Sequence, residues 1–323
     1  MKPKIFITAK IPNNAIEILS KHFDLLYNEA DKILSKEEII TGVKNSDILL
    51  CLLRDVIDKD VILANPNLKG ICNYAVGYNN IDVDFATEKG IPVTNTPDVL
   101  TETTADLAWS ILMAVSRRIK EADDFIRNEK FTGWQATLLL GSDIYGKTLG
   151  IIGAGRIGSA TAKRSLGFDM NVLYTSNNNN TFIDEKLGGE KMPLDELLQK
   201  SDFVSIHLPL TEKTGHLITK NELKKMKKTA FLINTARGKI VKEDDLVWTL
   251  ENGVIAGAAL DVFEFEPKVT QKLLKMKNVV LTPHIGSASK ETREKMAEMT
   301  ANGAISIINE EFPKNLVNTK IIG

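Results

Sequence analysis

The sequence has little cysteine, no long apolar segment and no block of charge of one sign. Its 323 residues include only two cysteines, Cys51 and Cys72, and both lie in apolar runs. Neither a disulfide framework nor a redox motif fits this pattern, so we predict reduced, buried thiols, as expected of a cytoplasmic protein. A catalytic cysteine is the less favoured interpretation.

The remaining absences exclude several classes of protein. No apolar run approaches the roughly 20 residues that cross a bilayer, and the first one is too short for a signal peptide. Lys and Arg number 41 against 42 Asp and Glu, a net charge of −1 without basic clusters, which argues against nucleic acid and membrane as partners. No spacing of His, Cys and Asp indicates a metal, and the GxSxG nucleophile elbow is absent.

What the sequence contains is an alternation of strand-like and helix-like segments, twice over. Near-continuous apolar strands that alternate with helices predict parallel sheets covered on both faces. The expected strands of the first series are 4–9, 46–53, 68–75 and 91–97, and its expected helices are 13–23, 35–43 and 58–66. Ser35 and Glu38 have the spacing of a capping box.

A long helical pattern at 101–127 and an aromatic-bearing arm at 131–146 separate the two series. The second series has expected strands at 149–153, 171–175, 203–208, 230–235, 254–262 and 279–284, and the chain ends with a long helix at 290–309. We therefore predict an α/β protein with two Rossmann-like or flavodoxin-like doubly wound parallel-sheet domains and a cleft between them.

The segment "GAGRIG", Gly153–Gly158, reads as a dinucleotide-binding turn. It follows an expected strand and opens an expected helix, which is the context that this motif requires. Gly153 would make the tight turn, Gly155 would let the backbone approach the pyrophosphate, and Gly158 would let helix and strand pack closely. A glycine turn that merely joins strand to helix is the alternative.

A neutral group stands where NAD-binding folds carry a carboxylate for the ribose 2′-hydroxyl. About 20 residues after the glycines come Thr175, Ser176 and Asn177, with no acid among them. An acid would repel a 2′-phosphate, whereas this group admits one and supplies donors. We predict that NADP(H) is preferred and keep NAD(H) as the alternative, because the usual arginine is also missing from the loop. Arg156, inside the glycine turn, is one cationic candidate.

Three charged residues follow late strands, where the ligand crevice of an open α/β sheet lies. They are Arg237, Glu266 and His284. Reduction of a 2-keto acid needs a proton for the carbonyl oxygen, which a histidine backed by a carboxylate can supply. An arginine can hold the substrate carboxylate and polarise the carbonyl. Each residue also has a structural interpretation when it is taken singly.

Together these motifs resemble the D-isomer-specific 2-hydroxyacid dehydrogenase family, and within it the glyoxylate/hydroxypyruvate reductase branch. The resemblance covers nearly the whole chain and runs through "VGYNNID", "IPVTNTPDVLTETTADLA", "LGIIGAGRIG", "INTARGKIV", "GAALDVFEFEP" and "LTPHIGSAS". It implies reduction of glyoxylate and hydroxypyruvate to glycolate and D-glycerate, with Arg237, Glu266 and His284 as catalytic residues. The alternatives are an NAD-linked D-glycerate or D-lactate dehydrogenase and, more remotely, a dinucleotide-sensing corepressor.

The resemblance also assigns the surrounding residues. The backbone of Val76–Gly77 would hold the substrate carboxylate, Leu53 would line the same pocket, and Ser287 would adjoin the substrate. Asp261 would contact the nicotinamide amide. The implied cofactor contacts are completed by Ile157, His207, Pro209, Thr235, Ala236 and Gly286. We expect His207 to form a wall of the site, whereas His22 and His216 lack an evident partner and read as surface or packing residues.

The family topology implies a discontinuous substrate-binding domain, 1–99 with 288–323, and an inserted dinucleotide-binding domain, 100–287. The latter would include the connecting helix and the dimerisation arm, with the dimer contact in the region of about 100–140, so a homodimer is expected. One residue departs from the branch. A tryptophan that some reductases send into the partner's substrate pocket falls on Leu138 here, with Trp134 four residues earlier.

Overall fold

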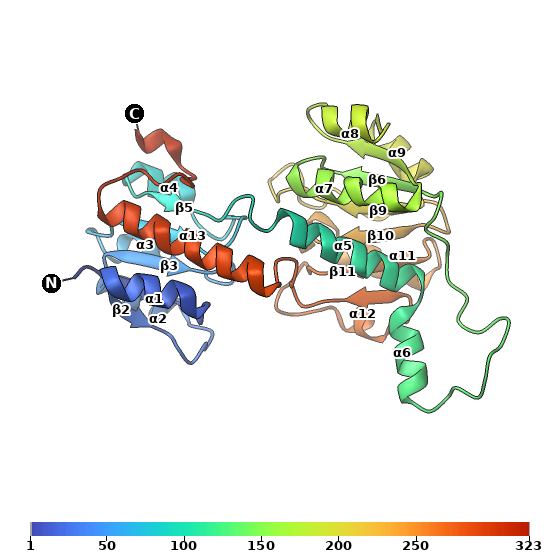
Figure 1. Ribbon diagram of the computed structural model, residues 1–323, viewed down its shortest axis with the longest axis horizontal. Coiled ribbons are helices and arrows are strands. Elements are labelled where there is room, and N and C mark those ends of the chain that lie inside the picture. The colour runs from blue at the N-terminus through green and yellow to red at the C-terminus, as the bar shows by residue number, and fades with distance from the viewer. Residues whose placement is uncertain (1, 323) are drawn as a thin grey trace. The chain divides into compact units, whose positions relative to one another are not determined.

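The structure is a computed structural model that describes residues 2–322. It divides into two compact units at two points of the chain. Unit 1 takes the chain as far as Leu100 together with the chain from Ser287 onward, and unit 2 is Thr101–Gly286 (Figure 1). Each unit has its own sheet and its own core, and each is described by itself.

Unit 1 is built on a five-stranded sheet in the order β2-β1-β3-β4-β5, in which every pairing is parallel. Its strands are β1 (Lys4–Ile7), β2 (Asp24–Tyr27), β3 (Ile48–Cys51), β4 (Gly70–Asn73) and β5 (Val93–Thr94). Helices α1 (Asn13–His22) and α13 (Lys290–Ile308) cover one face of the sheet. Helices α2 (Lys36–Lys44), α3 (Lys59–Leu63) and α4 (Val83–Glu88) cover the other face, and a short 3-10 turn (Thr319–Ile322) follows near the C-terminus.

Local sequence signals explain much of unit 1. The capping box that Ser35 and Glu38 predict is present at the start of α2, where each side chain meets the other's backbone N–H. Cys51 and Cys72 are free and buried, as expected, and burial raises the pKa of the Cys72 thiol to about 12. Strand β2 was not predicted, because its sequence, Asp-Leu-Leu-Tyr, shows no alternation of polar and apolar residues. Its side chains are exposed or only partly buried.

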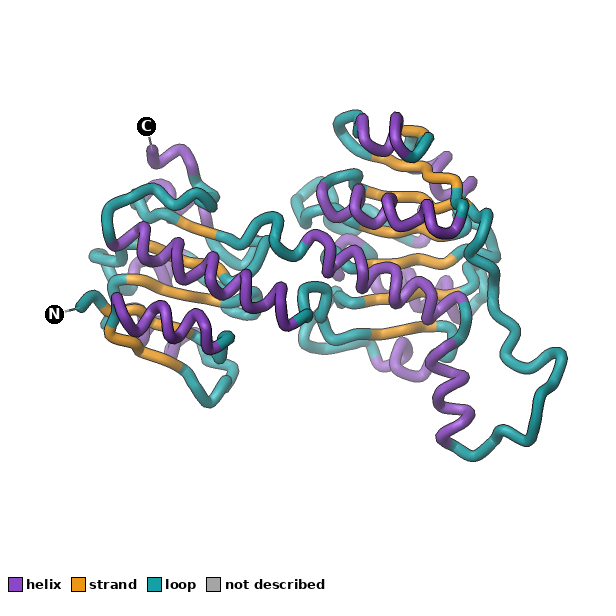
Figure 2. Tube along the Cα trace, in the orientation of Figure 1, coloured by secondary structure: helices purple, strands orange, loops and turns teal. Residues whose placement is uncertain are grey.

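Unit 2 has a seven-stranded sheet in the order β12-β11-β10-β9-β6-β7-β8, again parallel throughout. Figure 2 draws the strands of both units in orange and the helices in purple. Its strands are β6 (Thr148–Ile152), β7 (Asn171–Thr175), β8 (Glu190–Lys191), β9 (Phe203–Ile206), β10 (Phe231–Asn234), β11 (Gly257–Leu260) and β12 (Val279–Leu281). Both parallel sheets confirm the predicted fold class. Strand β8 is the seventh strand, which the sequence pattern missed because it is two residues long and exposed.

Helices cover both faces of this sheet as well. One face carries α5 (Thr101–Ser116), α7 (Arg156–Arg164) with the 3-10 turn Ser165–Phe168, and α8 (Thr181–Lys186). The other carries α9 (Leu194–Lys200), α10 (Lys220–Leu223), α11 (Glu243–Glu251) and α12 (Gln271–Lys275). Trp109 of α5 stacks on Phe168 at 4.9 Å and donates to the carbonyl oxygen of Thr161, which fastens α5 to α7.

The predicted single helix at 101–127 is wrong, because the chain breaks it into α5 and α6 (Ile119–Arg127). Arg118 adopts a left-handed conformation, with φ 54°. The returning arm, 131–146, supplies a hydrogen-bond donor to the last residue of α5. The backbone N–H of Ser142 donates to the carbonyl oxygen of Ser116 at 2.9 Å. No residue of α6 is buried, so α6 and the arm extend from the body of unit 2 (Figure 1).

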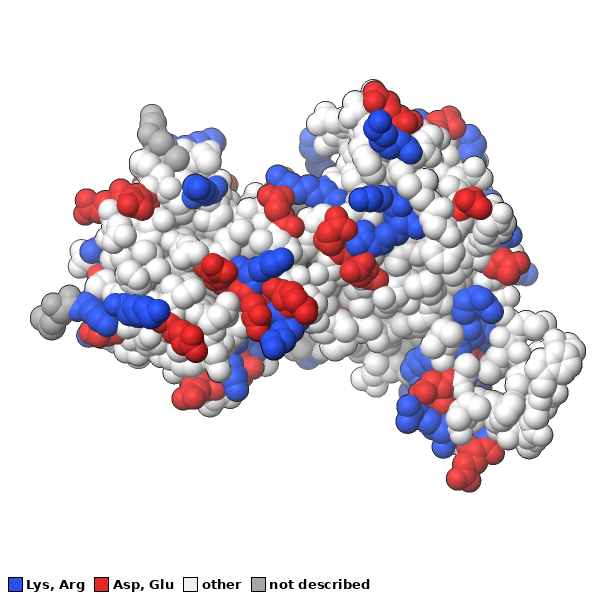
Figure 3. Space-filling model, viewed as in Figure 1, with Lys and Arg blue, Asp and Glu red and all other residues white. Residues whose placement is uncertain are grey.

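Charges are interspersed over the face of each unit that Figure 3 shows, and neither sign forms a continuous patch there. This distribution agrees with the balance of charge in the sequence. Within residues 2–322, none of the helices combines the length and the apolar composition that a bilayer crossing requires.

Candidate active site

The order of strands in unit 2 brings the three predicted catalytic residues to one end of the sheet. Strands β10, β11 and β12 are neighbours and run in parallel, so the loops after them leave from the same edge. Arg237 follows β10, Glu266 follows β11 and His284 follows β12. The three residues are separated by up to 47 positions along the chain, and adjacent parallel strands bring them together.

His284 and Glu266 form a bonded pair. Nδ1 of His284 lies 2.9 Å from Oε2 of Glu266, and the other carboxylate oxygen accepts from the backbone N–H of Phe263 at 2.9 Å. Nε2 of the imidazole is therefore the ring nitrogen that can serve a substrate. The side chains are 31% and 37% exposed, so both are open to a ligand.

Arg237 belongs to the same electrostatic group. Burial tends to raise the pKa of the Glu266 carboxyl, but the bond and charge of His284, the N–H of Phe263 and the charge of Arg237 bring that pKa below its ordinary value. Burial lowers the pKa of the Arg237 guanidinium, and Glu266 opposes this shift. Arg237, which is partly buried beside a carboxylate, keeps its charge and its planar set of donors.

Two residues that the sequence analysis did not single out fix the position of Arg237. Asn234, 1% exposed, accepts from the backbone N–H of Ala236 at 3.0 Å and donates to the carbonyl oxygen of Arg237 at 3.0 Å. Gly238 lies so close to the next loop that an added Cβ would be 1.9 Å from the backbone of Phe263. The Asn-x-x-Arg-Gly spacing was the available signal, because it matches a side chain that closes its own turn.

Asp261 holds the loop that carries His284. Its carboxylate accepts from the hydroxyl of Thr282 at 2.6 Å and from the backbone N–H groups of Ile285 and Gly286, both at 2.8 Å. The backbone N–H of His284 donates to the carbonyl oxygen of Asp261, while His284 itself has a left-handed φ of 54°. The predicted contact of Asp261 with nicotinamide stays a prediction, and positioning of the 282–286 loop is an additional role.

The glycine turn fits a dinucleotide pyrophosphate. Gly153 has φ +98°, and a Cβ on Gly158 would lie 2.1 Å from the carbonyl oxygen of Gly153, so both positions require glycine. A Cβ on Gly155 would meet nothing within 4 Å, which leaves open space beside the first residues of α7, Arg156 and Ile157. Helix N–H groups that face open space form a site for phosphate oxygens.

A second observation, at the same edge of the sheet, also fits a ligand. Thr235 is 8% exposed at the end of β10, and its hydroxyl has no hydrogen-bond partner among residues 2–322. His207, at the end of β9, lies 2.8 Å from the hydroxyl of Ser205, and burial lowers its pKa to about 3. A neutral His207 suits the predicted wall, beside the exposed Pro209.

The run of four asparagines has two different parts. Asn180 is structural, because its side-chain amide donates to the carbonyl oxygen of Ala154 at 2.8 Å and to the hydroxyl of Ser159 at 2.7 Å. Its carbonyl accepts from the N–H of Ile183 and so caps α8. Asn177–Asn179 are exposed, beside the partly buried Thr175 and Ser176. The neutral group predicted from the sequence is thus held against the glycine turn by Asn180.

The structure brings a cation to this loop that the sequence analysis missed. Lys191, on β8, places its Nζ 3.0 Å from Oδ1 of Asn179 and 3.3 Å from the carbonyl oxygen of Asn177. The parallel pairing of Lys191 with Tyr174 of β7 puts it there. No local signal marks this lysine, since β8 is short and the residue is 14 positions away from Asn177.

Two of the residues predicted to bind substrate from unit 1, Val76 and Gly77, follow the end of β4. Asn95 donates to the carbonyl oxygen of Val76 and Asn73 to that of Gly77, both at 2.8 Å. Within the described chain, the backbone N–H groups of Val76 and Gly77 donate to no protein acceptor, which is the arrangement that a carboxylate needs. Leu53 and Ser287, both partly buried, also belong to unit 1.

Other predictions need correction or remain open. His216 is not without a partner, because its Nε2 lies 2.6 Å from Oε1 of Glu264, which is 48 residues away in the sequence. Trp134 is 86% exposed and Leu138 is partly buried. Residues 2–322 contain no cluster of three or more His, Cys, Asp or Glu side chains that would hold a metal.

Comparison with known proteins identifies the family. Residues 109–286 match the model of the D-isomer specific 2-hydroxyacid dehydrogenase NAD binding domain. The glyoxylate reductase of Thermococcus onnurineus is 48% identical over 326 residues, which cover 100% of this chain and 98% of that protein. The glyoxylate reductase of Korarchaeum cryptofilum is 49% identical over 324 residues, with the same coverage.

A solved structure agrees with this assignment. The NADPH-dependent glyoxylate/hydroxypyruvate reductase of Sinorhizobium meliloti, in complex with NADP and malonate, has a TM-score of 0.85 and 31% identity. The match covers 98% of this chain and 97% of that one. The resemblance predicted from the motifs is confirmed. The chain belongs to the D-isomer specific 2-hydroxyacid dehydrogenase family and is an oxidoreductase that uses a nicotinamide dinucleotide.

Proposed function

We propose that the chain reduces glyoxylate and hydroxypyruvate to glycolate and D-glycerate with NADPH. The observation that carries this proposal is the His284–Glu266 pair at 2.9 Å, with Arg237 in its electrostatic field. The names of the sequence relatives, glyoxylate reductases that align over the whole chain, support the same substrate class.

The catalytic residues divide the work of the reduction. When bound, the nicotinamide supplies a hydride to the carbonyl carbon of the substrate. His284 then donates a proton from Nε2 to the carbonyl oxygen, while Glu266 holds the ring at Nδ1. Arg237 presents a planar fork that can bind the substrate carboxylate and polarise the carbonyl. For unit 1 we keep the proposal that the N–H groups of Val76 and Gly77 bind a substrate carboxylate.

Preference for NADPH is supported by the region around the asparagine run. Ser176 and Asn177 are neutral, and Lys191 brings a positive charge within 3.3 Å of the backbone of Asn177. A cation beside neutral donors suits a 2′-phosphate better than a 2′-hydroxyl. An NAD-linked D-2-hydroxyacid dehydrogenase is the second candidate, because the same hydroxyl and amide groups can bind a 2′-hydroxyl. The bonded His284–Glu266 pair favours turnover over a corepressor role.

The arm of unit 2 supports the proposed homodimer. Phe131, Trp134, Leu140 and Tyr145 are 54%, 86%, 64% and 70% exposed. Most of the arm is free of charged side chains in Figure 3, where it lies at the lower right. An apolar arm of this size fits a protein surface that a second copy would cover. A cytoplasmic location remains a prediction.

The proposed function is tested by mixing the purified protein with glyoxylate or hydroxypyruvate and following the oxidation of NADPH and of NADH across concentrations. We expect oxidation with both keto acids and a higher kcat/KM for NADPH. A higher kcat/KM for NADH would favour the NAD-linked dehydrogenase. Absence of oxidation with either dinucleotide would contradict the proposed reaction.

A further inference from the structure

The loop that carries Glu266 is exposed, yet one buried carboxylate holds it at both ends. Residues 265–268 of this loop are exposed. Glu243, the first residue of α11, is only 3% exposed. Its Oε2 accepts from the backbone N–H of Glu264 at 2.9 Å, and its Oε1 accepts from the backbone N–H of Thr270 at 3.1 Å. The two donors bracket Glu266 in the sequence.

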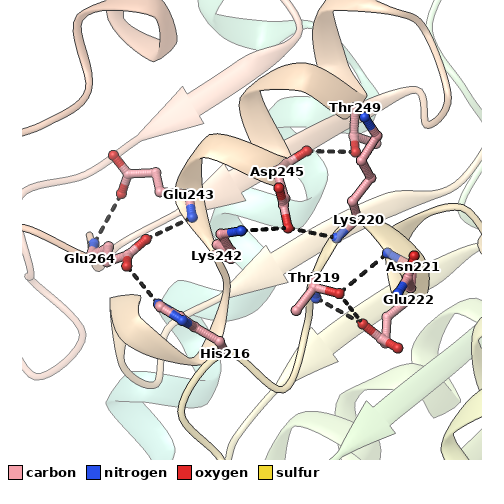
Figure 4. A network of polar contacts seen from close by, with 10 residues as sticks. All are labelled: His216, Thr219, Lys220, Asn221, Glu222, Lys242, Glu243, Asp245, Thr249 and Glu264. Carbon is pink, nitrogen blue, oxygen red and sulfur yellow. Dashed lines mark hydrogen bonds and ion pairs between the residues drawn. The ribbon is translucent and has the colours of Figure 1, made fainter.

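Glu264 and Glu243 bond reciprocally, because each carboxylate accepts from the backbone N–H of the other residue. Oε2 of Glu264 accepts from the backbone N–H of Glu243 at 2.8 Å, and Oε1 of Glu264 lies 2.6 Å from Nε2 of His216, as Figure 4 shows. An N–H in the first turn of a helix has no acceptor within the helix, so Glu264 satisfies a group that would otherwise need water. The side chain of Glu264 is 10% exposed, which makes this reciprocal contact a protected one.

The start of α11 is itself a fixed platform for this contact. Asp245 accepts from the backbone N–H of Lys220 at 3.0 Å and forms an ion pair with Lys242 at 3.5 Å (Figure 4). The ammonium group of Lys220 lies 3.3 Å from the centre of the Trp248 ring, a cation–π contact. Glu243 therefore transmits the position of a well-anchored helix to the loop.

The hydrogen bond within the loop does not involve residues 264 and 270, which Glu243 holds. The backbone N–H of Lys268 donates to the carbonyl oxygen of Phe265 at 2.8 Å, which closes a local turn around Glu266. Val269 packs against the core and is partly buried. A local turn fixes the shape of the loop, whereas the position of that turn relative to the sheet depends on what holds residues 264 and 270.

We propose that Glu243 is a positioning residue for the His284–Glu266 pair. By accepting from both ends of the 264–270 loop, Glu243 keeps the Glu266 carboxylate at Nδ1 of His284. Glu243 touches neither partner of the pair and acts through the backbone. This inference rests on the proposed function, because it assigns Glu243 to the same reaction.

The test compares three variants of the first turn of α11. Glu243→Gln keeps the shape but turns one acceptor into a donor that faces an N–H. Glu243→Asp keeps the charge but is one methylene too short to reach both donors. Asp244→Asn is the control, because Asp244 is the next residue, is exposed and loses the same charge. All three variants retain Arg237 and Asp261, which also act electrostatically on the pair.

We expect both Glu243 variants to lower kcat for keto-acid reduction by about tenfold, with the KM for NADPH unchanged. The alkaline limb of their pH–rate profile should also move to lower pH, because the Glu266 carboxylate lies at Nδ1 of His284 for only part of the time. Asp244→Asn should change neither. A shift in Glu243→Gln alone would indicate an effect of charge and overturn the proposal, as would no shift in either variant.

A measurement without turnover separates this inference from the proposed function. Histidine ring signals can be followed by NMR, since the chain has only four histidines. The ring signals of His284 should shift in both Glu243 variants and not in Asp244→Asn, because the Glu266 carboxylate moves relative to Nδ1. If the variants fail to fold, amide hydrogen exchange of the wild type decides. Slow exchange at Glu264 and Thr270 is expected, and fast exchange at both would overturn the proposal.

Discussion

The sheet of unit 2 has β12 at one side and β8 at the other, and the loops at these two ends of the strand order differ in how they hold their functional groups. At the β10–β12 end, Arg237, Glu266 and His284 are set by side-chain and backbone hydrogen bonds from Asn234, Phe263 and Asp261. At the β7–β8 end, Asn177–Asn179 and Lys191 are exposed, and their few contacts are with one another.

The difference suits the two tasks that we propose, proton transfer and recognition of the ribose phosphate. Proton transfer depends on distances within tenths of an ångström, so displacement of a catalytic group by about 1 Å can cost about 100-fold in rate. Recognition of a ribose phosphate depends on charge, which acts over several ångströms and tolerates loose geometry. We therefore expect changes at the first end to alter turnover, and changes at the second end to alter the choice of cofactor.

The largest effect is expected at His284. His284→Ala removes the proposed proton donor and should lower kcat by about 10²- to 10⁴-fold, while the Kd for NADPH, measured by fluorescence titration, stays the same. His22→Ala, at an exposed position of α1, is the matched control and should leave kcat unchanged. Equal turnover in the two variants would remove His284 from the mechanism.

Gly238 tests whether the catalytic end depends on close packing of the backbone. In Gly238→Ala the new methyl group would lie 1.9 Å from the backbone of Phe263, so the Glu266 loop has to move. We expect a loss of about 1–3 kcal/mol in the free energy of unfolding, together with a lower kcat. Gly167→Ala, where a Cβ meets nothing within 4 Å, is the control, and denaturant unfolding measures both. Similar stability of the two variants would contradict the close contact.

The opposite end of the sheet should respond in affinity alone. Lys191→Met is expected to raise the KM for NADPH about fivefold, roughly 1 kcal/mol, without affecting NADH, because it removes the exposed cation that we propose for the 2′-phosphate. Lys186→Met, on α8, is the exposed control. Ser176→Asp should act further, by repelling the 2′-phosphate and shifting preference towards NADH. If Lys191→Met raises the KM for both cofactors equally, Lys191 does not read the 2′-phosphate.

The smallest effect concerns acid stability. The pKa of Glu266 is lower in the folded protein than its ordinary value of 4.5, because the bond and charge of His284, the N–H of Phe263 and the charge of Arg237 together outweigh burial. A carboxyl with a depressed folded-state pKa contributes stability above its unfolded value, which is lost as pH falls through the folded-state pKa. The melting temperature of the wild type should therefore exceed that of Glu266→Gln at pH 6, and the difference should shrink as the pH falls through the lowered folded-state pKa of Glu266. A constant difference would mean that ionisation of Glu266 contributes nothing.

Most of the fold was predictable, because long buried strands and helix caps are local signals. The elements that the sequence did not predict correctly are either short or end at a contact with a residue far away in the sequence. Strand β8 has two exposed residues, and α5 ends where Ser142 of the returning arm binds its last carbonyl group. His216 was misjudged because its partner, Glu264, lies 48 residues away.

By itself the sequence determined the class of chemistry: a glycine turn in a strand–turn–helix context and an arginine, a glutamate and a histidine after late strands. Such residue types and spacings are local, so they can be read without coordinates. Only the tertiary structure decided which groups support them. The pairing of β7 with β8 brought Lys191 to the asparagine loop, and the packing of α11 brought Glu243 to the two ends of the Glu266 loop. These pairings depend on strand order and register, which arise from packing of the whole sheet rather than from any short segment.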